Sequence, residues 1–379
     1  MIVIKTKVVF NATILNDKLT GLGVYCKNIL NRLENDFDHV LYTDKYLSIK
    51  YQTNKNIILN IASNSRFKTI ILRNYLFKKW INDNKSDSMI HYSPTQHGIV
   101  TKGIKQIITI HDLIPLYFPK GRFHQYIYYR FFLKRIINNS DVIITVSNNT
   151  KNDIIKEYKV EEKKIKVVYN GFDEVIEPIN KSYSKSYIRE KYKVENYILM
   201  VGIHYRYKNL HRVIEAYSNQ KKNLPGPLVI IGDYTCKYGN ELMKIVKEKN
   251  LQDEVRFLGF VSNEDKNRLY QAASLFIYPS LYEGFGLPVL EAMSNETLVA
   301  CSNTSSLPEV VADAAYKFNP ESVAEIEEAL LKMTKLTKEE FKDYINRGKQ
   351  RLKRFSWDKC AIEIQEIING VKNDSTEGL

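Results

Sequence analysis

The sequence has few cysteines and no long hydrophobic run. Its four cysteines, Cys26, Cys236, Cys301 and Cys360, stand far apart without a CxxC or Cys/His spacing, which argues against a disulfide framework, a zinc site or a redox motif. No apolar run approaches the roughly 20 residues that span a bilayer. Residues 1–18 become polar too early for a secretory signal. We therefore expect a cytoplasmic protein.

Acidic residues are scarce in the first half of the chain. Residues 1–175 contain 27 Lys and Arg against 15 Asp and Glu, whereas the remainder contains 29 against 28. The stretches 66–80 and 121–138 interleave cations with aromatic residues and contain no acid. Such a surface suits anionic lipid, a phosphorylated acceptor or nucleic acid; a solvated basic face over buried aromatics is the alternative. Because no RNA-binding or helix-turn-helix signature is present, we expect contact with an anionic membrane and none with nucleic acid.

Short β-branched runs alternate with helical patterns along the 379 residues, which is typical of α/β domains with a parallel, doubly wound sheet. The alternation stops after Gly171 and then resumes. We predict a Rossmann-like domain over 1–174, a linker over 175–187 and a second Rossmann-like domain over 188–355. A last helix over 356–372 is expected to pack back on the first domain.

The string YPSLYEGFGLPVLEAM (278–293) follows a predicted buried strand. Pro288 suits the first turn of a helix, so the Gly-Phe-Gly loop before it directs backbone N–H groups and a helix dipole at an anion such as a diphosphate. Glu283 and Glu291 could then accept hydrogen bonds from hydroxyls on either side of the phosphates, which describes a nucleotide sugar. The alternative is a tight turn with Glu291 on a solvated face.

Two further sites follow predicted strands of the first half. Gly21 and Gly23 allow close approach of backbone to phosphate, although a dinucleotide fingerprint fails at Cys26 and a plain βα turn stays open. His111 and Asp112 end another strand, where side chains reach the expected cleft; a structural histidine is the alternative reading.

At these motifs the sequence resembles the retaining glycosyltransferases of family 4, which have the GT-B fold and include mannosyltransferase-like members of bacterial O-antigen and capsule assembly. The resemblance covers nearly the whole chain, in the segments 21–25, 111–119, 167–173, 201–210, 255–262, 282–293 and 302–315. It implies two doubly wound Rossmann-like domains that face each other across a cleft, and a sugar donor activated by a nucleotide.

The resemblance also implies roles for single residues. Glu283 would contact the donor sugar and Glu291 the ribose, while the backbone of Phe285, Gly286 and Leu287 would lie near the sugar and phosphates.

Lys208 matches the family's cation for the departing diphosphate, and fixed positive charge there favours the transition state. Where the family usually has an arginine the sequence has Tyr207 and Gly202, so Arg206 is the nearest substitute. His111 would face the donor sugar. A role for Glu309 near the nucleotide, or only in starting a helix, stays open.

The expected reaction needs neither cofactor nor metal. Asp36 and Asp38 form an Asp-x-Asp string, but they fall in a predicted turn, and Lys208 with a helix terminus supplies positive charge. No nucleophilic carboxylate is evident, and the resemblance implies a reaction on one face of the sugar.

We predict a metal-independent transferase at the inner face of the membrane, with GDP-mannose as the first candidate donor and a glycan or undecaprenyl-linked glycan as acceptor. The alternatives are a nucleotide-sugar epimerase of the same fold, and a non-catalytic basic protein that binds membrane or nucleic acid.

Overall fold

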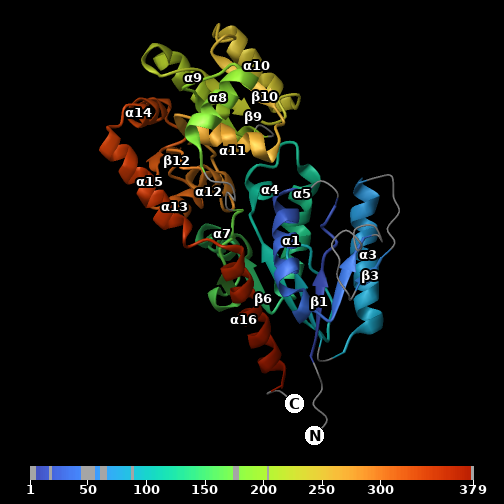
Figure 1. Ribbon diagram of the computed structural model, residues 1–379. Helices are drawn as coiled ribbons and strands as arrows, with labels where there is room; N and C mark the ends of the chain where they lie inside the picture. Colours follow the sequence, from blue (N-terminus) through green and yellow to red (C-terminus); the bar gives the residue numbers. More distant parts are fainter. Residues whose placement is uncertain are drawn as a thin grey trace. The chain divides into compact units, whose positions relative to one another are not determined.

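The protein is described by a computed structural model that covers residues 6–16, 19–43, 56–59, 66–86, 89–173, 179–202 and 205–376. The chain divides into two compact units (Figure 1). Unit 1 comprises Met1–Gly171 with Ser356–Leu379, and unit 2 comprises Phe172–Phe355. The chain therefore passes from one unit to the other at residues 171–172 and again at 355–356.

Unit 1 is built on a sheet whose described strands all run parallel, in the order β3-β2-β1-β4-β5-β6-β7. The strand order starts from the centre, where β1 and β4 are neighbours: β2 and β3 extend the sheet on one side, and β5, β6 and β7 extend it on the other. The point where the direction of this order reverses is the switch point of a doubly wound fold. The strands are β1 (Lys7–Asn11), β2 (His39–Tyr42), β3 (Asn56–Ile58), β4 (Met89–Ser93), β5 (Lys105–Ile110), β6 (Val142–Thr145) and β7 (Ile165–Val167).

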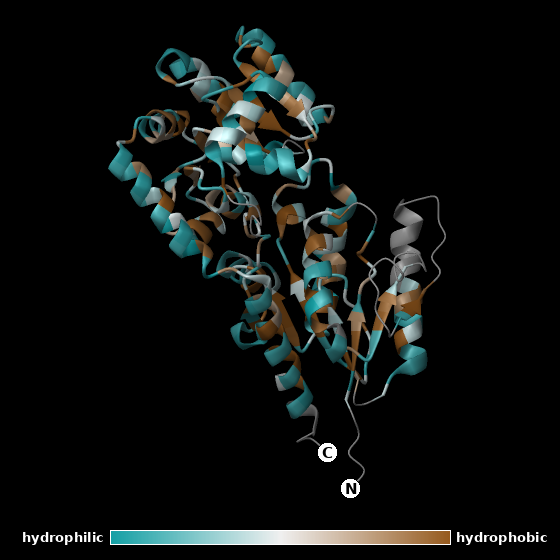
Figure 2. Cartoon of the chain, viewed as in Figure 1, coloured by the Kyte–Doolittle hydropathy of each residue, from teal (hydrophilic) through white to brown (hydrophobic). Residues whose placement is uncertain are grey.

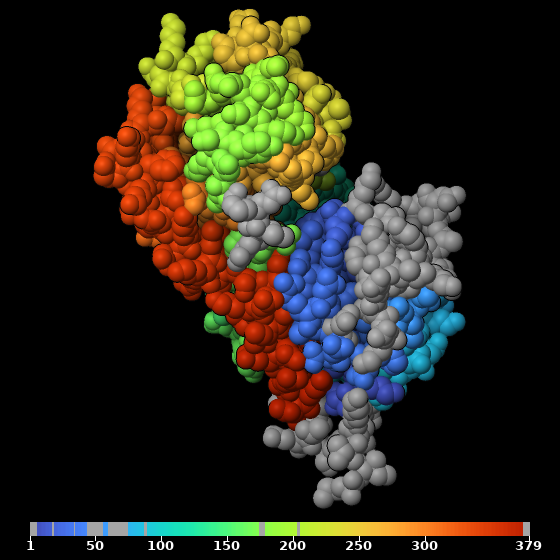
Figure 3. Space-filling model, viewed as in Figure 1, coloured from blue at the N-terminus to red at the C-terminus, as the bar shows by residue number. Residues whose placement is uncertain are grey.

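Helices connect these strands, as parallel pairing requires. They are α1 (Gly21–Leu33), η1 (Glu34–Asp36), α3 (Arg66–Asn84), α4 (Ile114–Tyr117), α5 (Phe123–Ile127), the π-helix η2 (Tyr128–Phe132), α6 (Leu133–Asn138), α7 (Asn148–Tyr158) and η3 (Glu162–Lys164). The last helix of the chain, α16 (Trp357–Thr376), lies along α1 in the same unit (Figure 3). Trp357 and Ile364 of α16 share a buried core with Tyr25 and Ile29 of α1.

Unit 2 repeats the architecture with a sheet in the order β10-β9-β8-β11-β12-β13, again parallel throughout its described strands. Its switch point lies between β8 and β11. The strands are β8 (Ile198–Val201), β9 (Leu228–Ile231), β10 (Val255–Gly259), β11 (Leu275–Tyr278), β12 (Val299–Ser302) and β13 (Tyr316–Phe318). The predicted class, two doubly wound Rossmann-like domains, is confirmed.

The helices of unit 2 cover both faces of this sheet. They are α8 (Lys181–Tyr192), η4 (Arg206–Lys208), α9 (Leu210–Gln220), η5 (Lys221–Asn223), α10 (Lys237–Glu248), α11 (Asn263–Ala272), α12 (Leu287–Ser294), α13 (Leu307–Val311), α14 (Val323–Thr334) and α15 (Lys338–Leu352). Apolar residues concentrate in the strands, while α15 is largely polar (Figure 2). In the described part of the chain no helix is both long and apolar enough to cross a bilayer.

The predicted linker over 175–187 is wrong in its second half, because residues 181–187 belong to α8. Asn180 caps this helix by accepting a hydrogen bond from the N–H of Tyr183, and α8 packs against α11. Residues 174–178 lie outside the described residues, as do residues 203–204 of the predicted 201–210 motif.

The Asp-x-Asp string is held by structural contacts in unit 1. Oδ2 of Asp38 accepts a hydrogen bond from the N–H of Val8 at 2.9 Å, and Oδ1 of Asp36 accepts one from Gln365 at 2.9 Å. Phe37 between them is buried and stacks on Phe10. The string therefore joins the end of α1 to β1 and α16.

Candidate functional site

The candidate site of unit 2 lies at the carboxyl edge of its sheet, at the switch point between β8 and β11. Lys208 ends the 3-10 helix η4 that follows β8, and Tyr278 is the last residue of β11. Glu283 stands in the loop between β11 and α12. Because β8 and β11 are paired neighbours, their ends meet at one point of the edge, which is where open α/β sheets bind ligands.

Lys208, Glu283 and Tyr278 form a closed triangle of hydrogen bonds. Nζ of Lys208 donates to Oε1 of Glu283 at 2.6 Å and to the hydroxyl of Tyr278 at 2.9 Å. The hydroxyl of Tyr278 donates in turn to the same Oε1 at 2.8 Å. The structure thus brings together two residues that the sequence predicted, with a third that it did not.

This triangle is mostly shielded from water. The side chains of Lys208 and Glu283 are 17% and 10% exposed. Burial by itself lowers the pKa of Lys208, but the Glu283 carboxylate and the nearby Tyr278 and Tyr207 outweigh it, so its pKa lies well above the ordinary value. Burial, and then the Glu283 carboxylate, raise the pKa of Tyr278. The ammonium therefore stays charged and the phenol stays protonated at neutral pH.

Serine side chains between β12 and α13 fix the loop that carries Glu283. The N–H of Glu283 donates to the hydroxyl of Ser305 at 2.9 Å. The hydroxyl of Ser306 lies 3.0 Å from the carbonyl oxygens of both Glu283 and Phe285 and can donate to either. Ser306 is fully buried, so these bonds satisfy polar groups that would otherwise be costly.

Asn209 anchors the segment that carries Lys208. Its side chain is fully buried and donates to the carbonyl oxygens of Pro279 at 3.1 Å and Pro320 at 2.7 Å. The N–H of Leu281 also donates to the carbonyl of Tyr207 at 2.8 Å. The loops after β8 and β11 are therefore tied to each other on both sides of the Lys208–Glu283 pair.

The Gly-Phe-Gly turn leads into α12 through a conformation that favours glycine. Gly286 has φ +103°, and a Cβ there would lie 2.6 Å from Cδ2 of Leu307. Gly286 is the N-cap of α12, so no side chain caps the first turn, and Pro288 follows inside it. Phe285 is buried and packs edge-on against Phe355, with ring centroids 5.5 Å apart. Leu287 is the first residue of the helix.

Glu291 lies in α12 and is held by two side chains of α11. Lys266 donates to its Oε1 at 2.9 Å, and the hydroxyl of Tyr270 donates to its Oε2 at 3.2 Å. The carboxylate is 27% exposed, so it is neither on a fully solvated face nor enclosed. Each of the two glutamates of the motif is thus paired with one lysine and one tyrosine.

Arg206 takes no part in the triangle. It forms an ion pair with Glu241 of α10, and the two side chains are 57% and 39% exposed. An exposed pair of this kind holds its arginine weakly.

The predicted residues of unit 1 form a separate set. His111 is buried, its Nε2 lies 2.9 Å from the carbonyl oxygen of Pro94, and its ring packs edge-on against Tyr25 at 4.6 Å. Burial lowers the pKa of His111 to about 4, so the ring is neutral and Nε2 donates. Asp112 accepts a hydrogen bond from the N–H of Ile114 at 2.9 Å, which starts α4.

Gly21 and Gly23 lie inside the first turn of α1, which begins at Gly21. A Cβ at Gly23 would come within 2.9 Å of Leu19, whereas one at Gly21 would meet none of the described residues within 4 Å. Packing against Leu19 therefore explains Gly23, and the structure gives no packing reason for Gly21.

Glu309 is in the first turn of α13, where its backbone carbonyl accepts a hydrogen bond from Arg351. Among the described residues, no group of three or more His, Cys, Asp or Glu side chains lies close enough together to hold a metal ion.

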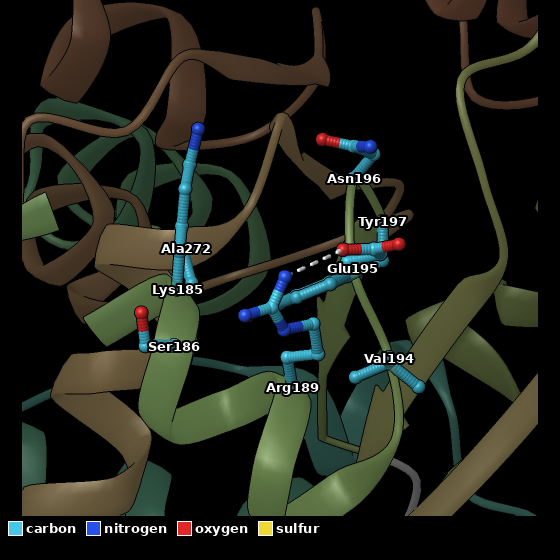
Figure 4. Close-up of a pocket in the computed structure, with 8 residues that line it drawn as sticks. All are labelled: Lys185, Ser186, Arg189, Val194, Glu195, Asn196, Tyr197 and Ala272. Carbon is cyan, nitrogen blue, oxygen red and sulfur yellow. Dashed lines mark ion pairs between the residues drawn. The ribbon is translucent and has the colours of Figure 1, made fainter. Parts of the chain in front are cut away.

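A pocket of about 150 Å³ lies elsewhere in unit 2 (Figure 4). Its lining includes Lys185 and Arg189 of α8, with Asn196 and Tyr197, which precede β8. It therefore lies at the amino ends of the strands, opposite the edge that carries Lys208. Arg189 and Glu195 pair loosely across it at 4.0 Å.

Sequence reasoning did not single out Tyr278, Lys266 or Tyr270. Tyr278 ends an apolar strand, where an aromatic residue is expected to be part of the hydrophobic core. Lys266 and Tyr270 are four positions apart on one face of α11, and that spacing was the only available signal.

Comparison with known proteins identifies relatives for both units. Residues 19–175 match the family model described as Glycosyltransferase Family 4, and residues 185–351 match the one described as Glycosyl transferases group 1. The O-antigen chain mannosyltransferase RfbU of Salmonella typhimurium is 30% identical over 363 residues, covering 92% of this chain and 96% of that protein. The O-antigen chain mannosyltransferase B of Escherichia coli is 31% identical over 277 residues, covering 71% and 70%.

Solved structures show the same fold. The crystal structure of Anabaena Alr3699/HepE in complex with UDP and glucose superposes with a TM-score of 0.74 at 17% identity, covering 97% of this chain and all of the other. The matched family models, together with a relative that aligns over nearly the full length, establish the family. The chain belongs to the family 4 glycosyltransferases, as the motifs of its sequence predicted.

Proposed function

We propose that this glycosyltransferase binds a nucleotide sugar at the carboxyl edge of unit 2 and transfers its hexose or N-acetylhexosamine, with retention of configuration, to a glycan or lipid-linked glycan. GDP-mannose is the first candidate donor. The observation that carries the proposal is the unused hydrogen-bonding capacity of the Lys208–Glu283 pair.

An ammonium group has three N–H donors. Lys208 directs one to Glu283 and one to Tyr278, and none of the described residues takes up the third, which is left for a ligand. Glu283 receives both of its side-chain donors on Oε1, and no donor from the described residues reaches Oε2. A fitting ligand must offer an anionic oxygen to the ammonium and, beside it, a hydroxyl to the carboxylate. The junction between a sugar and a diphosphate has both.

The rest of the loop suits the remaining parts of such a ligand. The first turn of α12, which has no side-chain cap, presents its backbone N–H groups and the positive end of the helix dipole toward a diphosphate. Glu291, one turn further on, keeps a partly exposed carboxylate for the hydroxyls of a ribose. Phe285, Gly286 and Leu287 would contribute backbone contacts.

For the chemistry we propose that Lys208 neutralises the diphosphate as it leaves, so that no divalent metal and no cofactor are needed. The acceptor hydroxyl would enter on the face from which the diphosphate departs. Glu283 is engaged by Lys208 and Tyr278 through one oxygen, which favours holding a sugar hydroxyl over attacking the anomeric carbon. His111, neutral and buried in unit 1, is proposed to face the donor sugar; Arg206 and the glycines Gly21 and Gly23 are proposed to assist at the phosphates.

The names of two relatives, both O-antigen chain mannosyltransferases, support mannose and a role in surface polysaccharide assembly. The Anabaena structure contains UDP and glucose, but at 17% identity it supports only the fold. The test is therefore a thermal-shift panel of GDP-, UDP- and dTDP-sugars. A ligand at 100 times its Kd stabilises a fold by about 2.7 kcal/mol, so the correct base should give a clear rise in Tm.

Transfer itself is tested with Glu283→Gln. We expect a loss of about 100-fold or more in transfer rate, the scale of losing one preorganised electrostatic contact, and no such loss for Glu248→Gln, an exposed glutamate of α10. Product analysis distinguishes a transferase from an epimerase, because an epimerised donor would form without any acceptor. If no sugar nucleotide raises Tm and Glu283→Gln transfers normally, the proposal fails.

We further propose that unit 1 contacts an anionic membrane through residues 121–138, here named the basic aromatic surface. Phe123, Ile127, Phe131 and Phe132 are 68%, 36%, 62% and 52% exposed. Arg130, Lys134 and Arg135 on the same helical segment are exposed as well. No acidic residue occurs between Leu113 and Ser140. Exposed aromatics among cations are typical of helices that lie in the membrane interface, and this surface would place the enzyme at the inner face of the membrane beside a lipid-linked acceptor.

The other basic stretch of the sequence, residues 66–80, forms part of α3. The side chains of residues 66–74 lie outside the described residues, so the proposal depends on the basic aromatic surface alone.

A further inference from the structure

Tyr278 is a buried tyrosine whose hydroxyl contacts two charged side chains. It is 2% exposed, its ring stacks on Phe276 with centroids 5.7 Å apart, and it ends the central strand β11. Although the ring packs among apolar residues, its hydroxyl forms hydrogen bonds with two charged groups, the ammonium of Lys208 and the carboxylate of Glu283. Nζ of Lys208 also lies 5.2 Å from the centre of its ring.

A phenol has one hydrogen to donate and lone pairs to accept. In the triangle, Tyr278 accepts from Lys208 and spends its only hydrogen on Oε1 of Glu283. Both donors of the triangle therefore converge on one carboxylate oxygen. Without the phenol, Lys208 would be the only donor to Glu283 among the described side chains, and the carboxylate could rotate to offer either oxygen.

We propose that Tyr278 is a positioning residue: by saturating Oε1 it fixes the orientation in which Oε2 of Glu283 is offered to a hydroxyl of the donor sugar. This inference rests on the proposed function of the same site. Since the phenol acts on Glu283, which faces the sugar, and leaves the charge of Lys208 in place, its loss should weaken the binding of a nucleotide sugar more than that of the nucleoside diphosphate alone.

The test is Tyr278→Phe, which removes one oxygen and keeps the ring. The matched control is Tyr197→Phe, because Tyr197 is fully buried just before β8 and its hydroxyl donates only to the carbonyl of Leu269, at 2.6 Å. Tyr278→Phe removes two hydrogen bonds of the triangle and Tyr197→Phe removes one buried hydrogen bond, so both variants should lower Tm. Only the first touches the triangle.

Calorimetric titrations of wild type and both variants with GDP and GDP-mannose, or with the pair of the base that the thermal-shift panel selects, give the readout. For Tyr278→Phe we expect the Kd of the nucleotide sugar to rise about tenfold or more, as for the loss of one charge-assisted hydrogen bond, while the Kd of the diphosphate changes less than about threefold. The transfer rate constant kcat should fall as well. Tyr197→Phe should leave both affinities unchanged.

The inference is overturned if Tyr278→Phe binds the nucleotide sugar as tightly as Tyr197→Phe does, or if both ligands weaken in parallel, since either result means that the hydroxyl only supports the fold. If wild type binds neither ligand, the proposed function itself fails. If wild type binds both and Tyr278→Phe matches it, the function stands and only the positioning role is lost.

Discussion

Nζ of Lys208 lies 2.6 Å from Oε1 of Glu283, although 75 positions separate the two residues in the sequence. The pair lies at the switch point of the sheet in unit 2, because one residue follows β8 and the other follows its neighbour β11. Neither residue has an alternative partner of opposite charge among the described side chains. The energetics of the pair are therefore open to direct measurement.

A double-mutant cycle of Lys208→Met and Glu283→Gln should show strong coupling in the free energy of unfolding. Each single change leaves a buried charge unpaired and should cost about 3 kcal/mol. The double variant should cost less than the sum by about 2 kcal/mol. Urea unfolding of wild type, the two single variants and the double variant measures these free energies of unfolding. Additive costs would mean that the pair does not form in solution.

The same coupling should not depend on pH between 6 and 9. The folded-state pKa of Lys208 is raised above its ordinary value of 10.5, so its contribution to stability is fully present below pH 10.5 and is lost only as the pH rises through the higher folded-state value. A coupling that shrinks between pH 7 and 9 would contradict a charged lysine stabilised by Glu283.

Gly286→Ala should damage both fold and donor binding. The residue has φ +103°, and its new Cβ would meet Leu307 at 2.6 Å, so we expect a loss of about 1–3 kcal/mol in unfolding free energy and a weaker nucleotide-sugar complex. Gly370→Ala is the control: it lies in α16, and a Cβ there meets nothing within 4 Å. This control should be neutral or stabilising by about 0.5–1 kcal/mol. Equal effects of the two changes would contradict the strained turn.

Arg206 and Lys208 should differ sharply in their effect on transfer. Arg206 is exposed and paired with Glu241, so Arg206→Ala should reduce kcat/KM by less than about tenfold, in line with the weak energies of surface charges. Lys208→Met should reduce it by about 100-fold or more. Initial-rate measurements over a range of donor concentrations give kcat/KM for both variants. An equal loss of kcat/KM in the two variants would mean that Arg206 replaces the phosphate-binding arginine usual in the family.

The order of elements was predictable from the sequence because parallel strands buried on both faces appear as short apolar runs between amphipathic helices. The motif around Glu283 was predictable because a strand end, a glycine turn and a proline fix where backbone N–H groups point. Each of these signals is local. They identify two glutamates and a lysine one at a time, without showing which of them touch.

What the sequence did not reveal depends on distant contacts. The chain over 181–187 lacks apolar periodicity, since only Ser184 and Ile188 of α8 are buried. That helix is held instead by Arg268, whose guanidinium lies 4.2 Å from the ring centre of Tyr187, and by Tyr187 donating to Asp265. Tyr278 was missed for a similar reason, because Lys208, which donates to its hydroxyl, is 70 positions away in the sequence.

Acid should destabilise the fold through its buried histidines. Burial lowers the pKa of both His91 and His111 from 6.5 to about 4. A depressed folded-state pKa means that the stabilising contribution is present above pH 6.5 and is lost as the pH falls from 6.5 toward 4, by up to about 3 kcal/mol per histidine.

The contribution of one histidine can be isolated with His91→Phe. Its pH profile of unfolding free energy should be shallower than that of wild type between pH 6.5 and 4, by about one proton. Exposed His124 provides the control variant His124→Gln, which should keep the wild-type slope. Identical slopes for wild type and His91→Phe would show that His91 is not held neutral by the fold.

The basic aromatic surface should bind membranes that carry negative charge. Replacing Phe131 and Phe132 by serine removes exposed apolar area and keeps the charges, while replacing Arg130, Lys134 and Arg135 by glutamine does the reverse. We expect both variants to pellet less than wild type with vesicles that mix anionic and zwitterionic lipid. In the second variant the free energy of membrane binding should weaken by about 1 kcal/mol per cation removed.

Phe260→Ser is the control for the membrane test, because Phe260 is 77% exposed but lies in unit 2. Transfer to a water-soluble acceptor should be unchanged in all three variants. If wild type partitions equally into anionic and purely zwitterionic vesicles, the membrane contact is excluded and the transferase proposal remains.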